Sequence, residues 1–228
     1  HQHGVDTHIL PASPSLSHIS SSAAKEVCKL NGNTDEFVPL YVKAQMEKRL
    51  VNQTRVGITG TIGAGKSTIS KALVEIYTNA GEQIHDIDID AIASDMVYNR
   101  TEPVYAQLRE DIKELLGLSE ITRGSIGPII FNQKDKLVAY NKLLIQPLTT
   151  RIRAEIQGKE GVLLFNFALL SEGNLLPLVN NNVALLRVGS IEQIRRLVQR
   201  GYTPEQIERR LDSQYTYQKK ESEVLTAI

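Results

Sequence analysis

The chain has 228 residues, 41% of them apolar and 23% charged, which is typical of a globular protein with a sizeable core. Its 26 Lys and Arg residues balance 26 Asp and Glu residues, and this zero net charge argues against nucleic-acid binding as the main function. The single cysteine, Cys28, excludes an internal disulfide framework and favours a reducing compartment, which we expect to be the cytoplasm. No apolar run is long enough to span a bilayer, so we expect no membrane partner.

The segment 1–52 predicts one strand and two short helices. Val5–Leu10 alternates apolar and polar residues like a strand, Ala23–Leu30 has a short helical pattern, and Pro39–Leu50 carries apolar residues at helical spacing. These elements supply little apolar surface for a core of their own. We therefore expect this segment to pack against another part of the protein or to be a piece of a larger domain, with a domain boundary near residue 53.

Residues 56–68 combine an apolar strand, a glycine-rich turn and the start of a helix. Gly60–Ser67 follows the pattern G-x-x-x-x-G-K-S of a P-loop. Its glycines allow a tight turn whose N–H groups, with the N-terminus of the next helix, face a polyphosphate. Lys66 can reach the β- and γ-phosphates, and Ser67 can hold Mg²⁺. The predicted ATP and Mg²⁺ site consists of Gly60, Thr61, Ile62, Gly63, Ala64, Gly65, Lys66, Ser67 and Thr68.

Three aspartates follow at alternating spacing, after a predicted helix over 67–78 and along a predicted strand over 83–88. Asp86, Asp88 and Asp90 repel one another if they share a face, so they need a cation, a positive partner or exposure. At the carboxyl end of a strand beside a P-loop, they would face Mg²⁺ and an acceptor hydroxyl. Catalysis needs a carboxylate near that hydroxyl, but spacing alone does not say which one serves.

An inserted helical region is predicted over about 102–157. Its apolar residues recur at helical spacing on both sides of a predicted loop, Ser119–Pro128. Pro147 predicts a break or kink near Ile145, because proline cannot donate the helical hydrogen bond.

Two continuous apolar runs, Gly161–Phe167 and Val183–Val188, predict buried parallel strands. Amphipathic helices follow over about 190–218, the second starting at Thr203–Gln206 with a capping pattern. In P-loop kinases such helices form a lid whose arginines neutralise charge on the transferred phosphoryl group. We therefore predict an α/β fold, a P-loop kinase-type parallel sheet with helices on both faces, a helical substrate-binding insertion and a lid. Glu223–Ile228 is expected to be a shortened last strand.

The part of the chain over about 53–220 resembles the dephospho-coenzyme A kinase family. The most specific features are the P-loop followed by Asp88-Ile89-Asp90-Ala91-Ile92-Ala93 and then by Leu169-Leu170-Ser171-Glu172. Further matching positions include Thr122-Arg123, Gln146-Pro147, Arg200 and Arg210-Leu211-x-x-Gln214. The resemblance implies ATP-dependent phosphorylation of the ribose 3′-hydroxyl of dephospho-coenzyme A, the last step of coenzyme A synthesis.

The resemblance also implies roles for individual residues. Asp90 would be the catalytic base, and Asp88 would orient substrate or hold Mg²⁺ through water. Lys66, Arg200 and Arg210 would be catalytic residues that neutralise the negative charge of the phosphates. The remaining matches, Arg123, Glu172 and Gln146, would bind the substrate.

Several positions depart from the family pattern. The family often has aspartate where Asn166 stands, proline where Ala168 stands and histidine where Gln146 stands. Two alternatives therefore remain open, another small-molecule P-loop kinase and a catalytically degenerate domain that binds nucleotide or coenzyme A.

The segment over about 5–50 resembles the C-terminal end of phosphopantetheine adenylyltransferase, through Leu10–Pro14, His18–Ser22, Lys25–Val27 and Val38-Pro39. In that family the serine turn, here Ser20, Ser21 and Ser22, binds ATP at a helix N-terminus. The catalytic element of that family is absent, so we expect no adenylyltransferase activity. The resemblance implies a fused bifunctional coenzyme A synthesis protein, with possible self-association through this segment and an oligomeric state left open.

Overall fold

The structure is a computed structural model and describes residues 13–227. The predicted strand Val5–Leu10 therefore lies outside the described residues. Four parallel strands form one sheet with the order β2-β3-β1-β4. The strands are β1 (Gln53–Gly60), β2 (Ile84–Asp88), β3 (Gly161–Asn166) and β4 (Val183–Leu186).

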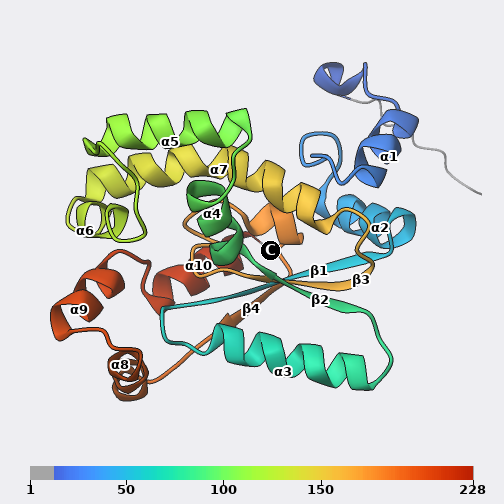
Figure 1. Ribbon diagram of the computed structural model, residues 1–228. Helices are drawn as coiled ribbons and strands as arrows, with labels where there is room; N and C mark the ends of the chain where they lie inside the picture. Colours follow the sequence, from blue (N-terminus) through green and yellow to red (C-terminus); the bar gives the residue numbers. More distant parts are fainter. Residues whose placement is uncertain (1–12, 228) are drawn as a thin grey trace, which may run out of the picture.

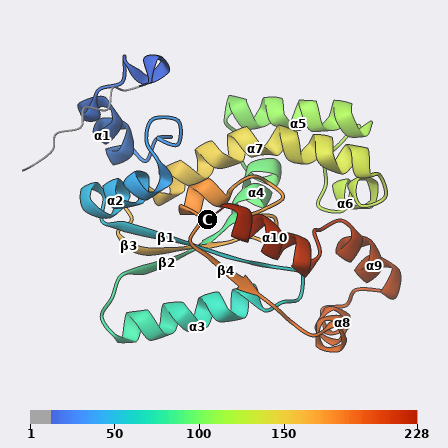
Figure 2. The same ribbon diagram turned by 180° about the vertical axis from the view of Figure 1, so that it is seen from behind.

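Helices cover both faces of this sheet, as predicted (Figure 1). Helix α3 runs along one face, and α4, α7 and α10 lie on the other, as the reverse view also shows (Figure 2). The helices are α1 (Ser21–Lys29), α2 (Leu40–Leu50), α3 (Lys66–Asn79), α4 (Ile89–Tyr98), α5 (Pro103–Leu116), α6 (Ile126–Ile130), α7 (Lys134–Ile156), α8 (Ser190–Gln199), α9 (Pro204–Asp212) and α10 (Tyr217–Ala227). Two 3₁₀ turns, η1 (Pro14–Leu16) and η2 (Leu176–Val179), complete the described elements.

The core lies between the sheet and the inserted helices α5 to α7. Leu163 and Phe165 of β3 are fully buried and belong to one apolar cluster with Ile112 of α5 and Ile152 and Ile156 of α7. The continuous apolar run of β3 therefore reflects burial on both faces of the sheet. This packing fixes the insertion beside the carboxyl end of the sheet, where parallel-sheet proteins bind their ligands.

The structure corrects three expectations about these elements. Helix α7 runs continuously through Pro147, so the predicted break near Ile145 is wrong; packing against α4, α5 and α6 offsets the cost of a proline inside the helix. The chain end forms helix α10 and not a last strand, with Lys220 and Val224 buried one turn apart. The last part of the predicted loop over Ser119–Pro128 is also helical, because α6 begins at Ile126.

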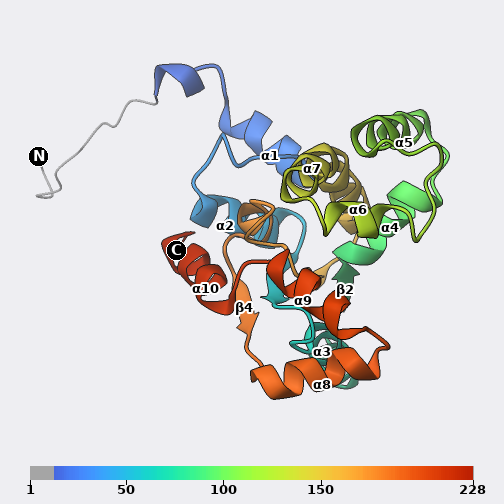
Figure 3. The ribbon, with the colours of Figure 1, turned by 90° about the vertical axis from the view of Figure 1, so that its left-hand side faces the viewer.

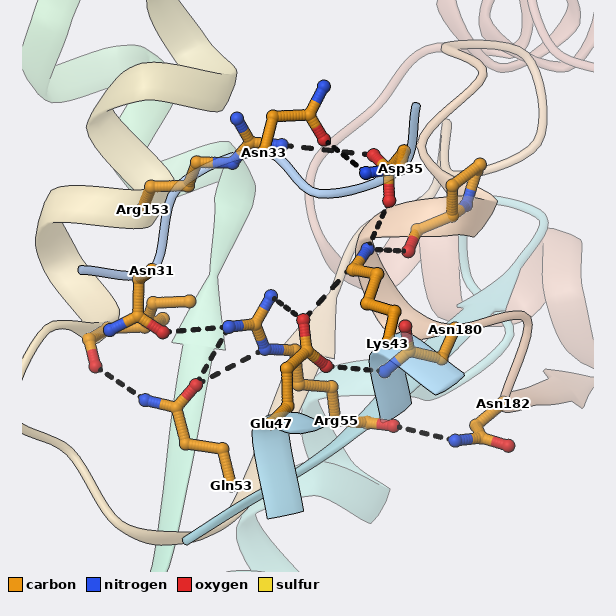
Figure 4. Close-up of polar contacts among 12 residues, drawn as sticks. Asn31, Asn33, Asp35, Lys43, Glu47, Gln53, Arg55, Arg153, Asn180 and Asn182 are labelled. Carbon is orange, nitrogen blue, oxygen red and sulfur yellow. Dashed lines mark hydrogen bonds and ion pairs between the residues drawn. The ribbon is translucent and has the colours of Figure 1, made fainter. Parts of the chain in front are cut away.

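The N-terminal helices α1 and α2 pack on the amino end of β1 through buried polar groups (Figure 4). The Arg55 guanidinium of β1 lies 2.8 Å from the Glu47 carboxylate of α2, and both side chains are almost fully buried. Lys43 of α2 donates to Asp35 at 2.5 Å and to the Pro177 carbonyl at 2.6 Å. Buried charges need partners of this kind. Through α2, which contacts β1, and α1, which contacts α2, residues 24–52 therefore pack on the rest of the fold.

Candidate functional site

The P-loop lies between β1 and α3, and its backbone requires glycine at two positions. A side chain on Gly60 would place its Cβ 2.6 Å from the Leu186 carbonyl oxygen of β4, so the strands could not approach as they do. Gly65, at the N-cap of α3, has a φ of 94°, which lies in the left-handed region. The turn thus presents the N-terminus of a 14-residue helix to the cavity, where its free N–H groups favour an anion.

Lys66 stands at the first position of α3. Its ammonium group donates to the carbonyl oxygens of Gly60 at 3.1 Å and Thr61 at 3.3 Å. Burial, with smaller contributions from nearby Lys220 and Arg200, lowers the pKa of Lys66 to about 8, whereas Asp90 and Glu172 oppose the shift. A bound polyphosphate would favour the charged form of this lysine.

The carboxyl ends of β2 and β3 bring three oxygen-bearing side chains together. Asp88 is paired in register with Asn166, and the Asn166 amide lies 3.4 Å from the Ser67 hydroxyl. Asp88 also caps α4, because its carboxylate accepts the Ala91 N–H at 2.9 Å. Hydroxyl, carboxylate and amide oxygens suit Mg²⁺, which binds proteins through few ligands and keeps contacts to phosphate and water. These residues therefore fit a magnesium ion.

Asp90 lies in the first turn of α4 and lines two cavities at once. Burial and the neighbouring Asp88 raise the pKa of its carboxyl group, and Lys66 opposes this rise. A raised carboxyl pKa suits a group that accepts a proton during a reaction. Asp86, the other aspartate of the series, is exposed as Asp88 and Asp90 are, but it lines neither cavity.

One of these cavities is polar and the other is apolar. The polar one, about 360 Å³, is lined by the P-loop, Asp88, Asn166, Arg200 and Arg210. The apolar one, about 280 Å³, extends between α4 and α7 and is lined mainly by apolar and aromatic side chains, including Tyr98, Phe131 and Tyr140. A ligand could therefore place an apolar body between α4 and α7 and a hydroxyl group beside Asp90.

The lid helices contact the P-loop directly, as their position beside the start of α3 allows (Figure 3). The Gln193 amide of α8 donates to the Thr61 hydroxyl at 2.9 Å and to the Ile62 carbonyl at 2.6 Å. Arg196 donates to the Gly63 carbonyl at 3.2 Å. The Gln214 side chain accepts the Ile62 N–H at 3.0 Å. Sequence reasoning did not assign Gln193 or Arg196 to the site.

The predicted arginines stand on the lid and the insertion. Arg200 and Arg210 both line the polar cavity, and Arg210 lies over the rings of Phe131 and Tyr202 at 4.9 and 4.7 Å. Such stacking holds the guanidinium group in place. Arg123 lies 5.4 Å from the centre of the Tyr98 ring and shares a separate cavity of about 290 Å³ with Arg209 and Arg210.

Some predicted residues lie elsewhere. Gln146 is exposed and lines a different cavity, between α5 and α7. Ser20, Ser21 and Ser22 are exposed at the start of α1, where Ser20 accepts the Ala23 N–H as N-cap. In Figure 3, α1 lies well away from α8 and α9. Neither Gln146 nor the serine turn is brought to the P-loop.

Two further findings limit the kinds of site. Within residues 13–227, no cluster of three or more His, Cys, Asp and Glu side chains could hold a metal ion by itself. No helix in that described range is long and apolar enough to cross a bilayer.

Comparisons with known proteins agree with this geometry. The family model described as dephospho-CoA kinase matches residues 54–226. A dephospho-CoA kinase of Streptomyces avermitilis is 32% identical over 171 residues, covering 73% of this chain and 80% of the relative. One of Streptococcus mutans is 31% identical over 176 residues, covering 72% and 82%. A solved structure from Thermus thermophilus, 23% identical, has the same fold, with a TM-score of 0.54 over 73% of this chain and 83% of that one. With its P-loop, paired aspartates and lid, the chain belongs to the dephospho-CoA kinase family, a family of phosphotransferases.

Proposed function

We propose that this chain transfers the γ-phosphoryl group of ATP to the ribose 3′-hydroxyl of dephospho-coenzyme A, the last step of coenzyme A synthesis. The observation that carries the proposal is the position of Asp90, which lines both the P-loop cavity and the apolar cavity between α4 and α7. A phosphoryl acceptor bound between those helices would meet the donor at this carboxylate. The family relationship supports the same reaction.

The donor side would use the P-loop. Its N–H groups, from Gly60 to Thr68, and the Lys66 ammonium would hold the ATP phosphates. Ser67 and Asp88 would hold Mg²⁺, with the Asn166 amide beside them. When bound, Mg²⁺ would offset the negative charge of the phosphates.

The acceptor side would use the insertion. The apolar cavity suits the uncharged parts of dephospho-coenzyme A, and the cavity lined by Arg123, Arg209 and Arg210 suits its diphosphate. Asp90 would accept the proton of the attacking hydroxyl, whose oxygen bonds to the γ-phosphorus while ADP leaves. Arg200 and Arg210 would stabilise the negative charge of the transferred group.

Residues 1–52 we propose to be an adenylyltransferase-like C-terminal remnant joined to the kinase domain, residues 53–228. The serine N-cap of α1 and the resemblance of Leu10–Ser22 support this origin. We expect the chain as it stands to lack adenylyltransferase activity.

The test is ATP-dependent formation of coenzyme A from dephospho-coenzyme A, measured by mass spectrometry, for the wild type and Asp90→Asn. We expect the variant to lose about 10²- to 10⁴-fold in kcat because the proton acceptor is gone, while ATP still binds. Equal rates for both proteins would refute the role of Asp90. ATP binding without turnover in either protein would favour a degenerate binding domain, and transfer to a different alcohol in an acceptor panel would favour another kinase.

A further inference from the structure

Lys220 is a fully buried lysine on α10, outside the residues to which the reaction has been assigned above. Its ammonium group donates to the Glu172 carboxylate and, at 2.6 Å, to the Ala168 carbonyl oxygen. Burial lowers the pKa of Lys220, and the pairing with Glu172 opposes that shift. A charge buried this completely is costly, and an apolar pair of similar size would serve stability at least as well. The pair therefore calls for a reason other than stability.

Glu172 joins Lys220 to the end of the lid. One carboxylate oxygen accepts both Lys220 and the backbone N–H of Tyr215, the latter at 2.9 Å. The other oxygen accepts the Ser171 hydroxyl at 2.9 Å. Tyr215 follows directly after Gln214, whose side chain accepts the Ile62 N–H of the P-loop. The stretch 214–220 is thus held at three points on the catalytic end of the sheet.

The Ala168 carbonyl oxygen links Lys220 to β1, the strand that leads into the P-loop. It accepts the Thr59 hydroxyl at 3.3 Å as well as Lys220. Thr59 is fully buried on β1 and immediately precedes Gly60, the first P-loop glycine. Lys220 therefore contacts the loop after β3 directly. It is linked to β1 indirectly, because Lys220 and Thr59 donate to the same carbonyl oxygen.

The lid arginines lie between two anchors. On one side, Gln193 and Arg196 of α8 hold the P-loop backbone. On the other side, the chain from Gln214 to Lys220 is fixed by Glu172 and Ala168. Arg210 stands on the last turn of α9, close to the second anchor. Its guanidinium group stacks on Phe131 and Tyr202, and the second anchor fixes the chain that follows the helix from which Arg210 projects.

We propose that Lys220 and Glu172 form a latch that positions Arg210 and Gln214 for phosphoryl transfer. They are positioning residues in this role, because neither needs to touch the transferred group. The inference rests on the proposed kinase function for its kinetic part. In this proposal Glu172 acts through its contacts to Tyr215 and Lys220, in place of the substrate contact that the family resemblance implied.

The decisive variant is the double substitution Lys220→Met/Glu172→Gln, which removes both charges and leaves no unpaired one behind. The matched control is Glu223→Gln, which breaks an exposed ion pair with Lys219 on the same helix, at a separation of 2.5 Å, and keeps the Lys219 ammonium beside the Tyr215 ring. We expect both proteins to fold, as judged by circular dichroism. The latch variant should lose about 10- to 100-fold in kcat, with the KM for ATP within about threefold, since the lid arginines act on the transition state. The control should keep the wild-type kcat.

Coupling to Arg210 separates positioning from stability. In the wild type, Arg210→Gln should lower kcat by about 10²- to 10³-fold, as for other groups that stabilise transition-state charge. In the latch variant the same substitution should cost less than about 10-fold, because Arg210 is already misplaced. A wild-type kcat in the latch variant, or fully additive losses, would overturn the proposal.

Hydrogen–deuterium exchange tests the latch without any acceptor. Amides over 203–217 should exchange faster in the latch variant than in the wild type and the control, both with and without ATP. Unchanged exchange would overturn the latch even if the kinase assay succeeds. Faster exchange in the latch variant, found together with a wild type that phosphorylates no dephospho-coenzyme A, would retain the latch and refute the proposed function.

Discussion

Glu47→Gln tests how firmly the N-terminal helices belong to the kinase fold. Glu47 lies 2.8 Å from Arg55 and 4.0 Å from Lys43, and these three side chains are at most 4% exposed. The Asn180 amide also donates to the Glu47 carboxylate, at 2.5 Å. The substitution keeps the size of the side chain and removes its charge. Two buried cations, Lys43 and Arg55, then remain, and among residues 13–227 only Asp35 still forms an ion pair with either of them, through Lys43.

The expected loss follows from this burial. Removing one partner of a buried ion pair costs about 3–5 kcal/mol, because the other charge stays desolvated. Arg55 keeps the hydrogen bonds from its Nη2 to Asn31 at 2.8 Å and to Gln53 at 2.9 Å, but these bonds do not neutralise its charge (Figure 4). For a chain of this size, each kcal/mol lowers Tm by about 2–4 °C, so we expect a drop of about 6–20 °C.

Urea unfolding followed by far-UV circular dichroism measures the free energy, since the chain has no tryptophan to report by fluorescence. The control is Glu26→Gln, which removes an exposed pair with Lys29 at 2.7 Å and should cost less than about 1 kcal/mol. If Glu47→Gln cost no more than this control, residues 13–52 would not be held by the buried charges. The double variant Glu47→Gln/Arg55→Met should recover part of the loss, because it leaves one fewer buried charge unpaired.

Three further predictions concern the catalytic end. Asn166→Ala should raise the Mg²⁺ concentration needed for half-maximal activity by roughly 10-fold, because a polar neighbour of the metal is lost; an unchanged magnesium titration would exclude Asn166 from the metal site. Arg200→Gln should lower kcat by about 10²- to 10³-fold, because the variant lacks the Arg200 charge that would stabilise the transferred phosphoryl group in the polar cavity. Circular dichroism should be unchanged, because the side chain is exposed. A wild-type kcat would assign the charge-stabilising role to Arg210 alone. Gln146→Ala should change the KM for dephospho-coenzyme A by less than about twofold, since Gln146 lines a different cavity; a tenfold rise in KM would show that the substrate reaches between α5 and α7.

The elements that carry local signals were predictable from sequence. The P-loop strand, the following helix and the buried strand β3 have residue patterns that depend on neighbours in the chain. The capping box at Thr203 and Gln206 forms as its spacing predicted, with both hydrogen bonds present. Tertiary contacts explain two of the wrong predictions. Packing keeps α7 continuous at Pro147, and burial of one face makes residues 217–227 a helix.

The contacts between distant segments were not predictable in the same way. Gln193 and Thr61 are separated by 132 positions, and Lys220 and Glu172 by 48, so no local pattern pairs them. Lys220 looks in sequence like its neighbour Lys219, yet one is fully buried and the other is exposed. Gln193 carries no such clue, because the apolar residues Ile191, Ile194 and Val198 of α8 are exposed and the buried face consists of Gln193 and Leu197.

The two buried charge clusters act at opposite ends of one strand. Near the amino end of β1, Arg55 forms an ion pair with Glu47 of α2. Near the carboxyl end, Thr59 donates to the Ala168 carbonyl oxygen, which also accepts Lys220. Four residues of extended chain separate these positions by about 13 Å, a distance at which substitutions without shared partners usually add. Glu47→Gln should therefore lower the free energy of unfolding while leaving the kcat of the folded protein near the wild-type value. The latch variant should show the opposite combination. Combined in one chain, the two changes should give additive losses in both quantities, and a kcat that fell further than the latch variant alone would reveal a mechanical connection along β1 between the N-terminal helices and the phosphate site.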